Sequence, residues 1–72
     1  MEALLGKQAI EAYDEALGQL EPHERKAIIG RVELGLSYAE LARAMDRPSP
    51  DAARMAVARA LLKLAKHMNP PA

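Results

Sequence analysis

The residues with the most informative chemistry are the arginines and lysines of the C-terminal part of the chain. From Arg43 onward there are six of them against two carboxylates, whereas residues 1–22 hold one lysine against five Asp or Glu residues. Over the whole chain ten basic residues balance ten acidic ones, so the formal net charge is zero. This distribution predicts one basic face, on a molecule that is not a general polycation. The face is either a surface for nucleic-acid phosphates or a solvated face near the C-terminus of a helix.

A helix over residues 50–68 would display these charges. With about 3.6 residues per turn, one side of this helix is apolar and becomes the expected core face, made of Ala53, Val57, Ala60, Leu61, Leu64 and Met68. The opposite face is the one that could enter a major groove.

Two groups of residues on this outer face have different expected roles. Those near the helix start would approach base edges: Asp51, Ala52, Arg54 and Met55. Further along, Arg59 and Lys63 fall nearer the phosphates. Arg54 is the strongest candidate for guanine recognition, because its forked donors can meet two acceptors at once.

Three earlier helices are expected to position this one, over about residues 7–20, 22–34 and 38–45. Apolar residues at three- and four-residue spacing give the first helix a buried stripe of Ile10, Tyr13, Leu17 and Leu20, and give the second one of Ile28, Ile29 and Val32. Pro22 fits the first turn of the second helix. Gly35 follows that helix where a left-handed residue is expected, and Gly30 within it is either tolerated or a close-packing point.

Two serines mark the starts of the last two helices. Ser37 precedes Glu40 by three residues, the pattern of a reciprocal capping box, and Ser49 precedes Pro50. Capping is therefore the favoured role of both hydroxyls. Between these helices, Asp46-Arg47-Pro48 ends the third helix, whose expected inner face is Leu41, Ala42 and Met45.

The last two helices form a helix-turn-helix pattern over residues 38–68. Ala42 fits this arrangement, because a small side chain lets the two helices cross closely. We therefore expect a single all-α domain over residues 1–72, with four helices, a C-terminal helix-turn-helix and no winged elements. Fifteen alanines and only two aromatic residues agree with a helical core built from aliphatic side chains.

Catalysis, metal binding and membrane insertion are not indicated. His23 and His67 lie on different predicted helices, without a serine or cysteine nucleophile or a glycine-rich phosphate loop, so we expect no enzyme, no metal and no cofactor. The chain has no cysteine, no signal-peptide pattern and no apolar run long enough to span a bilayer. We expect a cytoplasmic protein without a membrane partner.

Three segments carry a resemblance to a known family. Leu20–Ile29 (LEPHERKAII), Glu33–Ala42 (ELGLSYAELA) and Ala58–Leu64 (ARALLKL) resemble region four of sigma-70 family sigma factors, especially the extracytoplasmic-function class. The similarity covers roughly residues 8–66. No part of the chain resembles region two, so we expect an excised or stand-alone C-terminal domain rather than a complete sigma factor.

The resemblance implies that the domain recognises the minus-thirty-five promoter element and docks on the β-subunit flap of RNA polymerase, as a monomer when isolated. It also implies binding by an anti-sigma factor, as is common in that family. Family motif positions place Ser37 and Tyr38 near a phosphate and Arg54 and Arg59 on the recognition helix, and the turn residues Arg47 and Ser49 complete the expected DNA-contacting set. The turn is one residue longer than the usual form, and Ala52 and Ala53 stand where threonine and valine are common.

Two other functions fit the same sequence. One is a protein-interaction module of this fold that binds an anti-sigma factor or the polymerase flap without recognising DNA. Met55 and Leu62, apolar residues on the outer face, are either isolated surface residues or contacts for thymine methyls or for such a partner. The other is a response-regulator-type helix-turn-helix output domain, which would dimerise on DNA through its last helix.

Overall fold

The part of the chain that the structure describes folds into four α-helices and one π-helical turn. The structure, a computed structural model, describes the backbone of residues 2–68 and the side chains of residues 8–68. The elements are α1 (Glu2–Gly18), α2 (Pro22–Ile28), the π-helical turn η1 (Ile29–Glu33), α3 (Tyr38–Ala44) and α4 (Pro50–Met68). The expected all-α class is confirmed. No helix among the described residues is long and apolar enough to cross a membrane.

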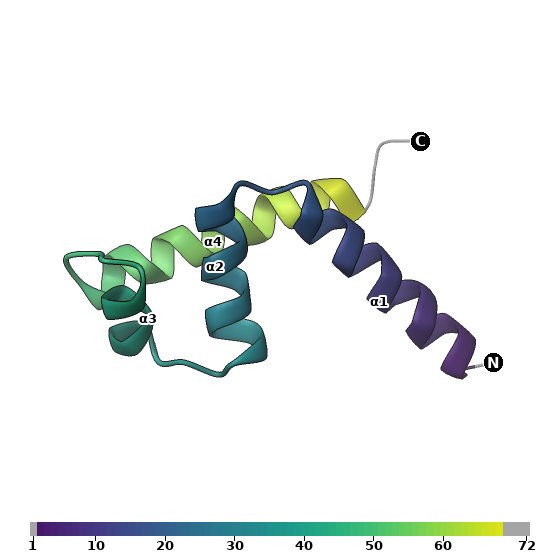
Figure 1. Ribbon diagram of the computed structural model, residues 1–72, viewed down its shortest axis with the longest axis horizontal. Coiled ribbons are helices and arrows are strands. Elements are labelled where there is room, and N and C mark those ends of the chain that lie inside the picture. Colours follow the sequence, from purple (N-terminus) through teal and green to yellow (C-terminus); the bar gives the residue numbers. More distant parts are fainter. Residues whose placement is uncertain (1, 69–72) are drawn as a thin grey trace.

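The long helix α4 connects the other elements (Figure 1). The helices α2 and α3 pack against α4, and α1 meets it near its C-terminal end before projecting away from the rest of the molecule (Figure 1). The molecule is consequently elongated, with principal extents of 43 × 25 × 16 Å.

Both serines cap the helices that follow them, as predicted. The Ser37 hydroxyl accepts a hydrogen bond from the Glu40 backbone N–H at 3.1 Å, and the Ser37 N–H donates to the Glu40 carboxylate at 2.8 Å. The Ser49 hydroxyl accepts from the Ala52 N–H at 3.1 Å. These bonds satisfy backbone donors that a helix leaves free in its first turn, so the two serines set where α3 and α4 begin.

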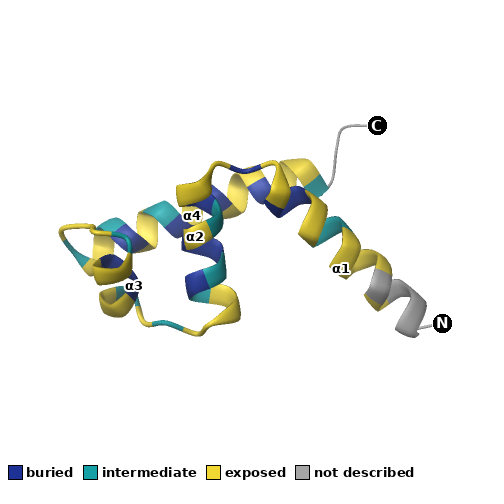
Figure 2. Cartoon of the chain, viewed as in Figure 1, coloured by how far each residue is buried: buried dark blue, intermediate teal, exposed yellow. Residues whose placement is uncertain are grey.

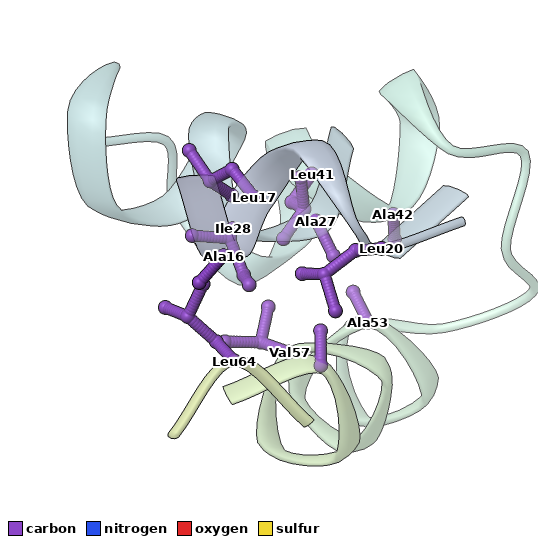
Figure 3. Packing of buried hydrophobic residues seen from close by; sticks show 11 residues of the cluster. Ala16, Leu17, Leu20, Ala27, Ile28, Leu41, Ala42, Ala53, Val57 and Leu64 are labelled. Atoms are coloured by element: carbon purple, nitrogen blue, oxygen red, sulfur yellow. The ribbon is translucent and has the colours of Figure 1, made fainter. Parts of the chain in front are cut away.

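A small core lies where the four helices meet. Figure 2 shows buried residues on the facing sides of the helices, and Figure 3 shows their side chains packed together. The cluster consists of Ala16, Leu17, Leu20, Ala27, Ile28, Leu41, Ala42, Ala53, Val57, Ala60 and Leu64. Five of its eleven members are alanines, which let the helix axes approach closely while contributing little apolar area each.

Glycines permit the chain path between α2 and α3. A Cβ at Gly30 would lie 2.6 Å from the Leu41 Cδ1 atom, so the close-packing interpretation of Gly30 is confirmed. Gly35 has a φ of +67°, the left-handed conformation expected after the helix. Between them the backbone forms a π-helical turn rather than the α-helix predicted to run to residue 34, with the Leu34 N–H donating to the Ile29 carbonyl at 3.0 Å.

Three residues predicted to be buried are exposed instead. Ile10 is exposed because the buried residues of α1 that pack on α4 belong to its last turn and to Leu20 beyond it. Val32 lies in the π-helical turn, where a spacing of more residues per turn moves it off the expected stripe. Leu61 lies at the edge of the core face of α4, and 40 % of its surface remains accessible.

A side-chain hydrogen bond also joins α1 to η1. The Tyr13 hydroxyl donates to the Glu33 carboxylate at 2.9 Å. Partial burial, and then this bond to an anionic acceptor, raise the pKa of Tyr13 to about 12. Tyr13 therefore keeps its proton and donates this bond at neutral pH.

Candidate nucleic-acid interface

The helix-turn-helix consists of α3, a five-residue connection and α4. The turn is held by backbone bonds, including one from the Arg47 N–H to the Ala42 carbonyl at 2.7 Å. Asp46 has a φ of 56°, a left-handed conformation that aspartate tolerates better than most residues. This conformation lets the chain reverse within the turn and leaves Arg47 exposed at its outer side.

The outer face of α4 presents the side chains predicted to read bases. Asp51, Arg54 and Met55 are exposed in its first two turns, and Ala52 is half-buried. Arg59 is exposed further along the helix. The opposite side is buried, so α4 has one side committed to the core and one side available to a ligand (Figure 2).

Arg54 is held by its neighbour Asp51. Its Nε and Nη2 donate to the same Asp51 carboxylate oxygen, at 3.0 and 2.8 Å. This contact raises the pKa of Arg54 above its already high value. Both side chains are more than half exposed, so the pair adds little stability. It does orient the guanidinium along the first turns of α4, with Nη1 outside the bonds to Asp51.

Lys63 points toward α2 instead of standing alone on the outer face. Its ammonium lies 2.6 Å from the Glu24 carboxylate, whose side chain is only 8 % exposed. Glu24 also accepts a bond from the Glu21 N–H at 2.8 Å. The contact with Lys63, and then this backbone bond, lower the pKa of Glu24, and the contact with Glu24 raises the pKa of Lys63.

A hollow with a volume of about 210 Å³ lies between the start of α2 and one edge of α4. We call it the basic hollow. Its lining is formed by His23, Glu24, Arg47, Ala52, Ala56, Arg59, Ala60 and Lys63. The structure thus brings together four predicted site residues from the turn and from three turns of α4.

Ser37 and Tyr38, which are predicted to lie near a phosphate, are at the start of α3 and outside the basic hollow. The Ser37 hydroxyl is used in capping. The Arg31 guanidinium stacks over the Tyr38 ring, with its Cζ 4.2 Å from the ring centroid, and donates to the Leu36 carbonyl at 2.8 Å. Neither Ser37 nor Tyr38 lines the basic hollow.

Sequence reasoning missed one residue of this interface. Glu24 lies near a predicted helix start and is the buried partner of Lys63. A single acidic residue in a predicted first turn gives no indication of a partner 39 positions away.

A second depression is apolar and lies on another side of α2. We call this depression, with a volume of about 370 Å³, the apolar groove. It is lined by Pro22, Arg25, Lys26, Ile29, Gly30, Leu34, Leu36, Leu41 and Ala44. Exposed apolar surface of this kind suits a protein partner better than a nucleic acid.

Comparison with known families now decides what kind of helix-turn-helix this is. The family described as Sigma-70, region 4 matches residues 10–64, which include α2, α3 and most of α4. The chain belongs to the sigma-70 region 4 family. Searches of curated proteins and of solved structures give no match. Region 4 is a DNA-binding, non-catalytic domain family associated with the minus-thirty-five promoter element and with RNA polymerase. In this region 4 domain, the match includes both the basic hollow and the apolar groove.

Proposed function

We propose that this domain reads the minus-thirty-five promoter element with the outer face of α4 during transcription initiation. The observation that carries the proposal is the presentation of Arg54, oriented by Asp51 and exposed, at the start of the second helix of a region 4 helix-turn-helix. In such motifs the first turns of this helix contact base edges. The domain acts as a monomer in the cytoplasm in this proposal.

The Asp51–Arg54 pair suits base reading because it reduces the freedom of the guanidinium before DNA arrives. A guanidinium fixed in one direction loses less side-chain entropy on binding. Its remaining donors can face the two major-groove acceptors of a guanine. Because the pair is exposed, Arg54 can also leave Asp51 at little cost.

The test is fluorescence anisotropy with a promoter duplex and a scrambled duplex at low salt, for the intact domain and for Arg54→Ala and Arg54→Lys. Arg54→Ala should lose about 1–3 kcal/mol of preference for one base pair. Arg54→Lys keeps the charge but loses the forked donors, so it should lose the same preference while binding the scrambled duplex normally. Equal affinity of the intact domain for both duplexes would sink the proposal.

The apolar groove favours a second role, docking on a protein. We propose that it receives the β-subunit flap of RNA polymerase, and that an anti-sigma factor would compete for the same surface. Such a contact would make promoter binding intramolecular within the polymerase and compensate for the few cationic contacts of the isolated domain. Tight flap binding with no response to either duplex would instead favour a pure interaction module.

The response-regulator alternative predicts a different stoichiometry. An output domain of that kind would place two copies on one duplex through α4, whereas the region 4 proposal requires one. Sedimentation of the domain with a duplex distinguishes the two by the mass of the complex.

A further inference from the structure

We infer that the basic hollow binds one phosphate group through Arg47 and Arg59, with the Glu24–Lys63 pair as its inner wall. In the promoter complex this phosphate belongs to the DNA backbone, so the inference rests on the proposed function and deepens it. It assigns to α2, outside the helix-turn-helix, a part in setting how strongly the domain binds DNA.

The basic hollow has an excess of positive charge. Arg47 and Arg59 line it, and the ion pairs among residues 8–68 are Lys63–Glu24 and Arg54–Asp51. The guanidinium groups of Arg47 and Arg59 therefore keep their charges unpaired. Three cationic groups against one carboxylate leave two net positive charges, before any charge on His23 is counted. Such a cluster attracts an anion that can accept hydrogen bonds from both arginines, such as phosphate.

The size and position of the hollow suit a phosphate group. Three alanines of α4 form part of its lining, so small methyl groups leave room beneath the arginines. A volume of about 210 Å³ corresponds to about seven water molecules at liquid density. A phosphate group with part of its hydration shell fits such a space. The hollow also lies at an edge of α4 rather than on its outer face, where a backbone would run if the outer face entered a groove.

Glu24 sets how strongly the hollow attracts an anion. Its buried carboxylate repels a phosphate and also draws the Lys63 ammonium inward to 2.6 Å. A glutamine at this position would retain an oxygen for the Glu21 N–H but would neither repel the phosphate nor hold Lys63. Glu24 is thus a positioning residue that weakens phosphate binding in the native domain.

The first experiment measures duplex affinity against salt concentration. Arg47→Ala and Arg59→Ala should each make the slope of log K against log salt shallower by about 1 and weaken the promoter and scrambled duplexes equally. Glu24→Gln should bind both duplexes more tightly and steepen the slope by about 1. Arg47 and Arg59 are exposed, so their alanine variants should fold even if Glu24→Gln does not.

The second experiment uses inorganic phosphate alone, followed through the Nε–Hε resonances of the arginines. Arg47 and Arg59 should shift together, and each alanine variant should abolish the shift at the other. Arg43→Ala is the matched control, because Arg43 is an exposed arginine of α3 outside the hollow. Shifts of equal size at every arginine would overturn the site.

The two experiments separate this inference from the promoter proposal. If Arg54→Ala loses base preference but Arg47→Ala leaves the salt slope unchanged, the hollow is not a phosphate site and promoter reading stands. If inorganic phosphate shifts Arg47 and Arg59 while neither duplex binds, the anion site stands and promoter reading is wrong. A weaker affinity for Glu24→Gln in a folded domain would overturn the role of Glu24.

Discussion

The short helix α2 contributes to two depressions of opposite character. The apolar groove has Leu41 in its lining, which is fully buried, and Gly30, whose missing side chain makes room for Leu41. The basic hollow is lined largely by exposed side chains and by alanines. The groove therefore shares its walls with the core, whereas the arginines of the hollow can change without opening the core. The proposed protein surface is tied to stability through Leu41, whereas the two arginines of the proposed anion site are not.

The largest effect should come from a residue that belongs to both the groove and the core. Leu41→Ala should lower the free energy of unfolding by about 3 kcal/mol, because it removes buried methyl groups and leaves a cavity. Urea denaturation followed by circular dichroism measures this loss. Leu62→Ala is the control: Leu62 is 67 % exposed and should change stability by no more than about 0.5 kcal/mol. Equal losses in the two variants would contradict the assigned core.

The next largest effect should come from a groove variant that weakens binding of the β-subunit flap but not of DNA. Leu34→Glu places a charge at the groove on a side chain that is 67 % exposed, so the fold should be preserved. We expect affinity for the isolated β-subunit flap to fall about tenfold, or about 1.4 kcal/mol, by titration calorimetry. The affinity of this variant for the duplexes should not fall in the same way.

Val32→Glu is the matched control for that prediction. Val32 is also exposed and also near the end of the segment after α2, but it does not line the groove. It should therefore leave flap affinity unchanged. If the two glutamate variants weaken flap binding equally, general charge rather than the groove governs the contact.

The helix starts could be predicted from the sequence because they depend on local chemistry. Ser37 with Glu40 and Ser49 with Pro50 form short-range patterns, and the backbone adopts them as expected. The end of the second helix could not be predicted. The helix continues there as a π-helical turn in which Gly30 packs closely against Leu41 of α3, a contact between distant residues that a periodic pattern does not indicate.

The candidate site shows the same division. The exposure of Arg54 and Arg59 follows from the position of each on a helix whose opposite face is apolar. The partners of Arg54 and Lys63 do not follow from that pattern. Asp51, which is expected to approach base edges, also binds Arg54, and Glu24 reaches Lys63 only because α2 packs against α4. The DNA-contacting roles of these residues remain predictions.

A smaller loss of stability is expected from a substitution that strains the backbone next to the groove. Gly35 lies between Leu34 and Leu36 with a φ of +67° and no atom near the position of a Cβ. Gly35→Ala should therefore lower the free energy of unfolding by about 1 kcal/mol through backbone strain alone. Gly18→Ala, also with open space around it, should leave stability unchanged or slightly raised. A lower urea midpoint for Gly35→Ala together with an unchanged or higher midpoint for Gly18→Ala would support this explanation. A loss of stability in both variants would contradict it.

The smallest effect concerns the acid end of the pH range and the inner wall of the hollow. The pKa of Glu24 is lowered by Lys63 and then by the Glu21 N–H, and the pKa of Glu40 is lowered by the N–H and hydroxyl of Ser37. A carboxylate with a lower pKa in the folded state stabilises the fold above its ordinary pKa of 4.5, and this stabilisation is lost as the pH falls through the lower folded value. Urea midpoints should fall below about pH 4.5, less steeply in Glu24→Gln and Glu40→Gln.

The control is Lys63→Met, which should reduce only the share of this acid-dependent loss that Glu24 supplies. The double variant Glu24→Gln, Lys63→Met should therefore show the same dependence of the urea midpoint on acid pH as Glu24→Gln alone. An additional flattening in the double variant would mean that Lys63 acts on a carboxylate other than Glu24.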